Sequence, residues 1–453
     1  MGLFQPSVPK LRENSSEEKI LMSMNLDRRT FLQTAAIGAA ASLRAMGAND
    51  RVNVAVIGLG GRGRNHMTEY AKLPDARIAA VCDVDQAALE RGIAFVEKAT
   101  GVKPKGYSDM RQVFADKSID AVSMPIPNHW HALATIWACQ AGKDVYVEKP
   151  ACHNVYEGMK MVEAARKYKR MVQIGSQSRS MPHKQKAIDL LHQGIIGKVY
   201  LAKGLCYKRR VSIGHKDDSP TPPGVDWSMF LGPAPMRAFN ELRFKYNWHW
   251  FWDTGNGDIG NQGVHEMDVA RWGLGKDMPK SVVSSGGKYA YTDDQETPNT
   301  QIATFDYGDS EIMFEVRGLI TGDEGGLKVR GNNTIGNLFY GSEGYMAVDG
   351  DGFQVYKGEK RDLIMDQKKE QGDTGPHMAN FLKAVKSRNY QDLNADVQIG
   401  VTSANLCHLA NISYRLGRKL GFDPSAGRFS SDAEANKMLT REYRAPYVVT
   451  DKV

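Results

Sequence analysis

The chain has 453 residues, more than a single hydrophobic core of about 250–300 residues accommodates, so its length predicts two domains with extensions. Hydrophobic residues make up 42% and charged residues 25% of the chain, which excludes a wholly disordered protein. The net charge is only +7 and basic residues are interleaved with acidic ones, so no nucleic-acid partner is expected.

Residues 1–50 are predicted to be a leader with a twin-arginine signal peptide. Arg28-Arg29 precede Phe31-Leu32, and the weakly apolar stretch 34–43 is too short to span a bilayer. We expect the protein to pass folded through the twin-arginine translocon into the periplasm or another extracytoplasmic space, with no membrane span in the mature chain. An amphipathic N-terminal helix is the alternative. Export of a folded protein favours a tightly bound cofactor that is regenerated in each catalytic cycle.

Residues 51–175 have the pattern of a Rossmann dinucleotide-binding domain. A β-branched run predicts a buried strand over 51–57, and a helix is predicted over 64–72. Between them lies a turn with the dinucleotide-binding glycine spacing, formed by Gly58, Gly60, Gly61, Arg62 and Gly63. Its glycines permit a tight turn, a close approach to the pyrophosphate, and packing of the helix on the strand. The N–H groups at the helix start would then face the phosphates.

A second strand, predicted over 77–82, ends at Asp83. A carboxylate at this place accepts hydrogen bonds from the adenosine ribose hydroxyls and repels a 2′-phosphate. The expected cofactor is therefore NAD. Arg62 and Arg64 lie near enough in sequence to keep NADP as the alternative.

Strands and helices continue to alternate along this domain. We predict helices over 86–100 and 132–141 and strands over 119–124, 144–147 and 171–175. Ligands bind at the carboxyl ends of strands in an open α/β sheet. The candidate cofactor-binding residues that follow these strands are Pro127, Asn128, His131, Glu148, Lys149 and Gln177.

Residues 176–425 are predicted to form a second α/β domain. Strands are expected over 198–204, 302–307, 311–316 and 344–348, and helices over 376–387 and 402–415. Residues 426–453 are expected to be a C-terminal tail that wraps a neighbouring domain or subunit. The five cysteines lie far apart without a CxxC pair, so neither a disulfide framework nor a metal site is predicted.

The runs Pro127-Asn128-x-x-His131 and Glu148-Lys149-Pro150 resemble the glucose–fructose oxidoreductase, inositol dehydrogenase and MocA family, over nearly the whole chain from about Val52. The resemblance implies a doubly wound parallel sheet followed by an open, mostly antiparallel sheet that carries the substrate site. It also implies a homodimer or homotetramer. Asp226-Trp227 is similar to a stretch in sugar-active members. The resemblance places Lys149 beside nicotinamide and substrate, where an ammonium group favours the alkoxide form of a hydroxyl.

The segment 255–272 is similar to the same family's glycine-rich turn and catalytic helix. Asn261, His265 and Asp268 have the spacing of one helix face. His265 matches the histidine that takes the proton from the hydroxyl being oxidised, a role that suits imidazole. Asn261 stands where the family usually has aspartate; an amide cannot act as a base, although it can orient a hydroxyl. Asp258 is the alternative carboxylate.

An aromatic run just before this turn is a candidate substrate surface. Tyr246, Trp248 and Trp250 are the candidates, because sugar C–H faces stack on aromatic rings. The alternative is that these residues form a domain core.

Three functions are compatible with these features. The first is an NAD(P)-dependent oxidoreductase that acts on a CH–OH group of a sugar, polyol or glycoside, with His265 as base and Lys149 stabilising the oxyanion. The second is an NAD-dependent glycoside hydrolase that works by transient oxidation, elimination and hydride return. The third is a non-catalytic sugar-binding protein, against which the joint presence of Lys149 and His265 counts.

Overall fold

The computed structural model describes residues 51–370 and 372–453. The predicted leader with Arg28-Arg29 lies outside the described residues. Within the described residues, no helix is both long and apolar enough to cross a membrane.

A six-stranded parallel sheet forms the N-terminal half of the described chain, in the order β3-β2-β1-β4-β5-β6. Its strands are β1 (Val52–Ile57), β2 (Ala76–Cys82), β3 (Lys105–Tyr107), β4 (Ala121–Met124), β5 (Asp144–Val147) and β6 (Val172–Ile174). The strand order reverses between β1 and β4, and ligands bind at such a switch point. This sheet confirms the predicted Rossmann fold.

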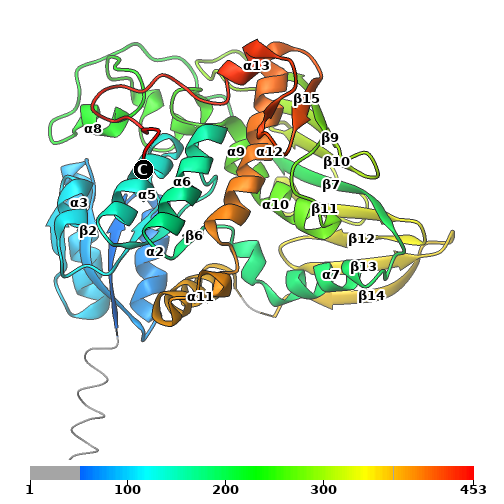
Figure 1. Cartoon of the computed structure of the whole chain (residues 1–453), viewed down its shortest axis with the longest axis horizontal. Helices are drawn as coiled ribbons and strands as arrows, with labels where there is room; N and C mark the ends of the chain where they lie inside the picture. The colour runs from blue at the N-terminus through cyan, green and yellow to red at the C-terminus, as the bar shows by residue number, and fades with distance from the viewer. Residues whose placement is uncertain (1–50, 371) are drawn as a thin grey trace, which may run out of the picture. The chain divides into compact units, whose positions relative to one another are not determined.

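Helices cover both faces of this sheet (Figure 1). They are α2 (Gly61–Lys72), α3 (Gln86–Thr100), α4 (Met110–Ala115), α5 (Asn128–Gln140) and α6 (Val155–Lys167). Two of them begin before the predicted start. The first turn of α2 is made by the glycine-rich turn itself, and α5 begins directly after Pro127, whose fixed φ suits the residue that precedes a helix.

The second half is built on a ten-stranded sheet in the order β14-β13-β12-β11-β7-β10-β9-β8-β15-β16. The strands are β7 (Val199–Lys208), β8 (Ser281–Gly287), β9 (Thr300–Asp306), β10 (Glu311–Arg317), β11 (Asn333–Gly341), β12 (Gly344–Val348), β13 (Gly352–Lys357), β14 (Asp362–Lys368), β15 (Leu420–Asp423) and β16 (Arg428–Phe429). Only the β7–β10 pair among them is parallel. The expected open, mostly antiparallel sheet is therefore confirmed.

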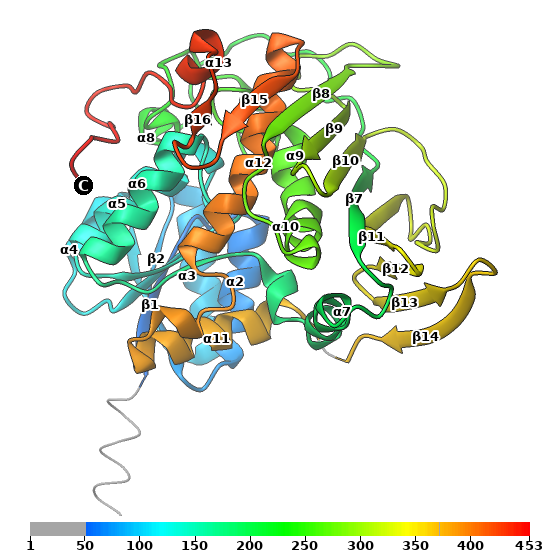
Figure 2. The same ribbon diagram turned by 45° about the vertical axis from the view of Figure 1, so that its right-hand side comes forward.

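Helices pack on one face of the second sheet, with α10 and α12 lying across β7 and β8 (Figure 2). The helices of this half are α7 (Pro182–His192), α8 (Trp227–Leu231), α9 (Gly257–Asn261), α10 (Gly263–Leu274), α11 (Thr374–Ser387), α12 (Val397–Leu416) and α13 (Ala433–Lys437). Helix α12 begins five residues before the predicted 402, because the Asp396 side chain caps it by accepting from the Gln398 amide.

Two late segments return to the Rossmann half. Helix α11 follows the second sheet in sequence, yet Met378 and Phe381 share a buried core with Val54 of β1 and Ile78 of β2. The end of the tail does the same: Tyr447 and other residues after it pack in the core that contains α5. Segments that follow the second sheet in sequence therefore pack in the cores of the Rossmann half.

Candidate active site

A cleft of about 770 Å³ opens at the carboxyl edge of the Rossmann sheet. This is a volume typical of small-molecule sites. One wall comes from the Rossmann half and includes Gly58, Gly60, Gly61, Arg62, Asp83 and Lys149. The other wall comes from the second half and includes Phe230, Phe244, Tyr246, Trp248, His249 and Asn261. The cleft therefore joins the two regions that the motifs single out.

The glycine-rich turn is shaped for a ligand that approaches the backbone. Gly58 has φ +90°, and a Cβ on Gly63 would lie 2.0 Å from the carbonyl oxygen of Gly58, so both positions require glycine. Beside Gly60 and Gly61 there is open space. The N-cap of α2 supplies no side-chain hydrogen bond, which leaves the first N–H groups of the helix to a bound group. These residues fit a dinucleotide pyrophosphate.

Asp83 lies at the end of β2 in the wall of the cleft. Its carboxylate accepts from the backbone amides of Leu59 at 2.7 Å and Asp85 at 2.9 Å, and burial raises its pKa. Arg62 and Arg64 are the two residues that kept NADP as the alternative cofactor, and the side chains of both are engaged away from Asp83. Arg64 lies over the Phe95 ring, 5.3 Å from its centroid, and Arg62 donates to Glu148 instead. The arrangement favours ribose hydroxyls over a 2′-phosphate at Asp83.

Arg91 of α3 also lines the cleft on the Asp83 side. Sequence reasoning missed this residue, since nothing in a solvent-exposed helix pattern marks one arginine among many.

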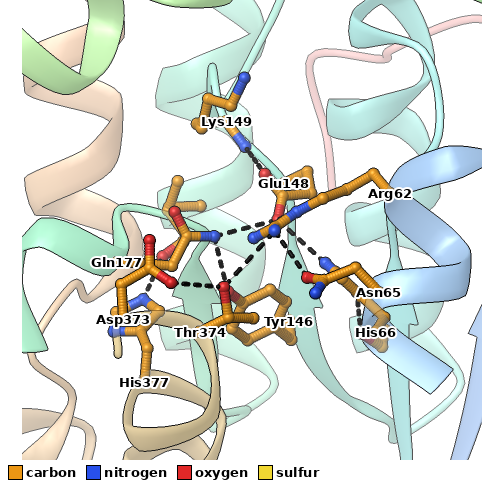
Figure 3. A network of polar contacts seen from close by, with 12 residues as sticks. Arg62, Asn65, His66, Tyr146, Glu148, Lys149, Gln177, Asp373, Thr374 and His377 are labelled. Atoms are coloured by element: carbon orange, nitrogen blue, oxygen red, sulfur yellow. Dashed lines mark hydrogen bonds and ion pairs between the residues drawn. The ribbon is translucent and has the colours of Figure 1, made fainter. Parts of the chain in front are cut away.

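Glu148 is held at the centre of a buried polar network (Figure 3). It accepts from Arg62 Nε at 2.8 Å, from Gln177 Nε2 at 3.2 Å and from the Lys149 backbone amide at 3.2 Å, and its Oε1 lies 3.0 Å from His66 Nε2. Burial alone would raise the pKa of Glu148, but the Arg62 charge holds it well below its usual range. Glu148 lines the cleft, and its hydrogen bonds fix the start of the loop that carries Lys149. Gln177 lies behind it, outside the residues that line the cleft, and donates to Glu148.

Lys149 points away from this network into the cleft (Figure 3). Its ammonium donates to the backbone oxygen of Asn261 at 2.9 Å, which leaves N–H groups for a ligand. The pKa of Lys149 is lowered to about 8, mainly by burial and also by the nearby positive charges of Arg62 and Lys208, while the charge of Glu148 acts in the opposite direction. A cation with a pKa near neutrality can stabilise an alkoxide and also release a proton.

The side chains of Asn261 and Asp268 have different surroundings, although the backbone between them is nearly continuous. Helix α9 ends at Asn261 and α10 begins at Gly263, and Gln262 between them has helical backbone angles (φ −80°, ψ −43°). Asn261 lines the cleft beside Lys149. Asp268 is fully buried elsewhere, accepting from Arg179 Nε at 2.8 Å and from the Ser403 hydroxyl at 2.6 Å. Asp268 therefore does not face a substrate, and the prediction for it was wrong.

His265 is partly exposed and lies one helical turn beyond Asn261, outside the residues that line the cleft. Burial and then the charge of Lys149 place its pKa well below the usual value. We expected a histidine that titrates near neutrality; the structure gives instead an imidazole that is uncharged at pH 7. An uncharged imidazole accepts a proton, as a general base must.

Asp258 is buried beneath the site rather than in it. It holds Arg210 in a bidentate ion pair, with Nε at 2.9 Å and NH2 at 2.6 Å. The Arg210 guanidinium also lies 4.9 Å above the Trp250 ring, and Trp250 is only 4% exposed. Asp258 and Trp250 are therefore supports for Arg210, which corrects their prediction as substrate contacts.

Tyr246 and Trp248 do lie in the wall of the cleft, together with His249. The Tyr246 side chain is exposed, and the ring of Trp248 stacks on the ring of His249 at 3.6 Å. His249 Nδ1 donates to the Tyr246 carbonyl at 2.5 Å, so its Nε2 is the acceptor nitrogen. His249 belongs to the aromatic run in which sequence reasoning expected histidine and asparagine side chains to bind sugar hydroxyls.

Two further predicted cofactor ligands lie under the cleft. Both ring nitrogens of His131 face backbone carbonyls, of Pro150 at 2.6 Å and Ile126 at 2.8 Å. Asn128 donates to Asn256 at 3.0 Å. His131 thus joins the loops after β4 and β5, and Asn128 joins the Rossmann half to Asn256, whereas Pro127 lines the cleft. Across the described ranges 51–370 and 372–453, no group of His, Cys, Asp or Glu is arranged to hold a metal ion.

Two family models match this chain. Residues 52–176 match the NAD-binding Rossmann fold of the GFO_IDH_MocA oxidoreductase family, and residues 186–318 and 320–449 match its C-terminal alpha/beta domain. These matches confirm the expected family, the NAD-binding domain and the oxidoreductase class.

Curated relatives include a glycosyl hydrolase family 109 protein of Shewanella pealeana, 28% identical over 204 residues, which are 39% of this chain and 45% of the relative. A protein of the same description from Saccharopolyspora erythraea is 29% identical over 218 residues, 47% of this chain and 42% of the relative. The chain thus spans under half the length of these relatives.

Solved structures share the fold. The WlbA dehydrogenase from Bordetella pertussis, crystallised with NADH and UDP-GlcNAcA, superposes with a TM-score of 0.62 at 19% identity, over 82% of this chain and 99% of that chain. An oxidoreductase domain protein from Kribbella flavida gives a TM-score of 0.64 at 16% identity, with the same coverage. At these identities the likeness shows the fold alone.

Proposed function

This chain belongs to the Gfo/Idh/MocA oxidoreductase family, and we propose that it is an NAD-dependent enzyme that oxidises a CH–OH group of a sugar, polyol or glycoside. The observation that carries the proposal is the meeting of Lys149 and Asn261 in the same cleft as the glycine-rich turn and Asp83. A hydroxyl placed there would lie beside a cation and close to a dinucleotide.

The residues present fit NAD. The open glycine turn would hold the pyrophosphate on backbone N–H groups, and Asp83 would accept from the adenosine ribose. When bound, NAD supplies a hydride acceptor at its nicotinamide ring.

We assign the proton chemistry to two side chains. Lys149 donates to the substrate oxygen and favours its alkoxide form, because its ammonium retains N–H groups after the bond to Asn261. His265 takes the hydroxyl proton, since its ring is uncharged. Asn261 orients the hydroxyl through its amide.

A strap over the adenosine side supports a tightly bound cofactor. We define the strap as residues 224–234. Its start is pinned to the loop after Asp83: the Gln86 amide donates to the Gly224 carbonyl at 2.9 Å, and the Asp226 amide donates to the Val84 carbonyl at 2.9 Å. Its middle and end are held by Arg444 of the tail, whose guanidinium donates to the Ser228 carbonyl at 2.6 Å and to the Gly232 carbonyl at 2.9 Å. Met229 and Phe230 of the strap line the cleft.

The experiment is to purify the protein and test whether NAD(H) co-purifies. Absorbance at 340 nm is then followed while a panel of free sugars and p-nitrophenyl glycosides is added. Net formation of NADH supports the proposal. A protein that reduces neither free nor bound NAD with any member of the panel, while still binding sugar, would refute it in favour of a non-catalytic sugar-binding protein.

A second candidate, an NAD-dependent glycoside hydrolase, is favoured by the matched relatives described as glycosyl hydrolase family 109 proteins. Transient oxidation of a ring hydroxyl acidifies the neighbouring C–H, the aglycone is eliminated, water adds, and the hydride returns. The same assay separates the two functions. Release of p-nitrophenol without net NADH supports the hydrolase, and NADH accumulation without p-nitrophenol supports the dehydrogenase.

We also propose that the enzyme works in the periplasm or another extracytoplasmic space after export, which the Arg28-Arg29 motif supports. Fusion of residues 1–50 to a folded reporter should direct it out of the cytoplasm, and Arg28→Lys with Arg29→Lys should abolish that export.

We further propose that the protein forms a homodimer or homotetramer. Exposed apolar side chains on the uncovered face of the second sheet, among them Tyr200 and Ile302, support it, and light scattering in solution tests it.

A further inference from the structure

We infer that the hydroxyl of Tyr246 is a hydrogen-bond donor to a substrate oxygen, carried by the carbon next to the one that is oxidised. The inference rests on the proposed function, since it takes the occupant of this end of the cleft to be a sugar, polyol or glycoside. Its basis is the direction of each hydrogen bond between Lys149, Asn261, Tyr246 and Arg210.

The first bond sets the orientation of the Asn261 amide. Lys149 is an ammonium group and can only donate; its Nζ lies 3.5 Å from Asn261 Oδ1 and 2.9 Å from the backbone oxygen of the same residue. A rotated amide would point its NH2 group at the ammonium, with donor facing donor. The Asn261 Nδ2 group therefore faces Tyr246.

The Tyr246 oxygen receives two donors. Asn261 Nδ2 lies 3.2 Å from it, and Arg210 NH1 lies 3.0 Å from it. Arg210 cannot turn away, because Asp258 holds the other edge of its guanidinium in a bidentate ion pair. Guanidinium and amide NH2 groups cannot accept, so the O–H proton of Tyr246 is not used by either neighbour.

That proton is left facing the cleft. Tyr246 lines the cleft and is 51% exposed, while Asn261 and Arg210, the two residues that donate to its oxygen, are buried or nearly so. The ring is packed edge-on against Trp250 and lies 4.7 Å from the His249 ring, which limits its rotation. The hydroxyl is therefore a fixed donor that only a ligand or water can satisfy.

The placement beside Lys149 selects the substrate oxygen. Lys149 contacts the oxygen atoms of Asn261 and Tyr246 accepts from the side-chain nitrogen of the same residue, so both groups adjoin one residue and can reach neighbouring oxygens of one small substrate. When Lys149 binds the oxygen that is oxidised, Tyr246 is in place for its neighbour. The substrate class is therefore one with two adjacent oxygens, such as a vicinal diol or a hydroxyl beside a glycosidic oxygen.

The side-chain amide of Asn261 determines the direction of the hydrogen bond between Asn261 and Tyr246. An aspartate at the same position would accept from Lys149 and would also accept the Tyr246 O–H, which would draw the proton away from the cleft. The conservative change Asn261→Asp is thus expected to remove the same substrate contact as Tyr246→Phe, although the phenol itself is still present.

The test compares wild type, Tyr246→Phe, Asn261→Asp and the double variant, all loaded with NAD. The probes are the p-nitrophenyl glycoside of the panel that is turned over fastest and its mono-deoxy analogues, followed at 340 nm and 400 nm. Tyr289→Phe is the matched control, since Tyr289 is 52% exposed and lies away from the cleft lining.

We expect Tyr246→Phe to lower kcat/KM about ten-fold, mainly through KM, and Tyr289→Phe to leave it unchanged. One deoxy analogue should be about ten-fold poorer than the parent for wild type but no poorer for Tyr246→Phe. Asn261→Asp should lose the same discrimination, and the double variant should lose no more. Isothermal titration calorimetry with the same glycosides gives a second measure that does not require turnover.

The outcomes separate this inference from the proposed function. If wild type turns over a glycoside and Tyr246→Phe keeps full discrimination among the deoxy analogues, the inference is overturned and the proposed function stands. If no glycoside reduces NAD but Tyr246→Phe weakens calorimetric binding about ten-fold, the donor role of Tyr246 stands, while its assignment to the oxygen beside the oxidised carbon and the proposed function both fail. If wild type neither binds nor oxidises any member of the panel, both are overturned.

Discussion

The buried ion pair between Arg179 and Asp268 offers a direct test of whether Asp268 has a structural or a catalytic role. The motif suggested a substrate contact, but the Asp268 side chain is 1% exposed and the Arg179 side chain 8%. Two Arg179 nitrogens donate to the Asp268 carboxylate at 2.8 and 2.9 Å, and the Ser403 hydroxyl donates to it at 2.6 Å. The change Asp268→Asn keeps the shape of the side chain and removes its charge.

The expected magnitude follows from what the change leaves behind. Removing one partner of a buried ion pair costs about 3–5 kcal/mol, because the remaining charge is left without compensation. The new amide can still accept one N–H, so we expect a loss near the lower limit, about 3 kcal/mol in the free energy of unfolding. The control Asp277→Asn removes a partner of Arg271 that is 85% exposed, and about 0.5 kcal/mol or less is expected there.

The assay is urea unfolding of both variants followed by circular dichroism, beside kcat for NADH formation on the folded protein. The structural reading requires a large shift of the unfolding midpoint for Asp268→Asn with kcat close to wild type. A variant with wild-type stability and collapsed kcat would refute the reasoning and return Asp268 to the active site.

Three other predictions concern the cleft. The pKa of Lys149 is lowered to about 8, mainly by burial, so its positive charge is present below that pH and is lost above it. The rate of NADH formation should therefore fall above about pH 8. Lys149→Arg should remove this fall from the pH–rate profile, because an arginine keeps its charge. Asp83→Ala should raise the affinity for NADP relative to NAD about ten-fold or more, measured by fluorescence titration with both reduced cofactors, because the carboxylate no longer repels the 2′-phosphate. Arg444→Ala should speed release of bound NADH, measured by trapping with a second dehydrogenase, by loosening the end of the strap; retention equal to wild type would contradict the role of the strap, and Lys452→Ala serves as control.

The Rossmann half and its turn were predictable because their signals are local. A β-branched run followed by Gly58-x-Gly60-x-x-Gly63 needs no distant partner to be recognised, and Gly63 is required by a contact only five residues away. Lys149 was predictable for the same reason, since it directly follows a strand and its motif is contiguous. Four strands of the second sheet (β7, β9, β10 and β12) were also predicted, whereas the other six and the sheet order were not.

The contacts that the sequence could not predict join residues that lie far apart in the chain. Arg62 lies in the predicted turn, yet it donates to Glu148, 86 residues away, and lies 3.5 Å from the Thr374 hydroxyl, 312 residues away. His131 was placed in the cleft by its motif, but backbone carbonyls occupy both of its ring nitrogens. The packing of α11 in the Rossmann core could not be predicted from local sequence either, because the pattern of an amphipathic helix does not specify which sheet it covers.

By itself, the sequence determined the fold class and the dinucleotide-binding turn, and it identified Asp83, Lys149 and His265 as candidate site residues. Short-range patterns of glycine, apolar and polar residues encode these features. Only the tertiary structure decided which charged groups form ion pairs with one another and which remain available to bind a ligand. Asp268 and Asp258 are neutralised by arginines from other elements, while Tyr246 keeps a free donor because Arg210 and Asn261 both donate to its oxygen. The physical reason is that a buried charge or polar atom takes the nearest partner in space, and that partner is set by packing rather than by sequence neighbours.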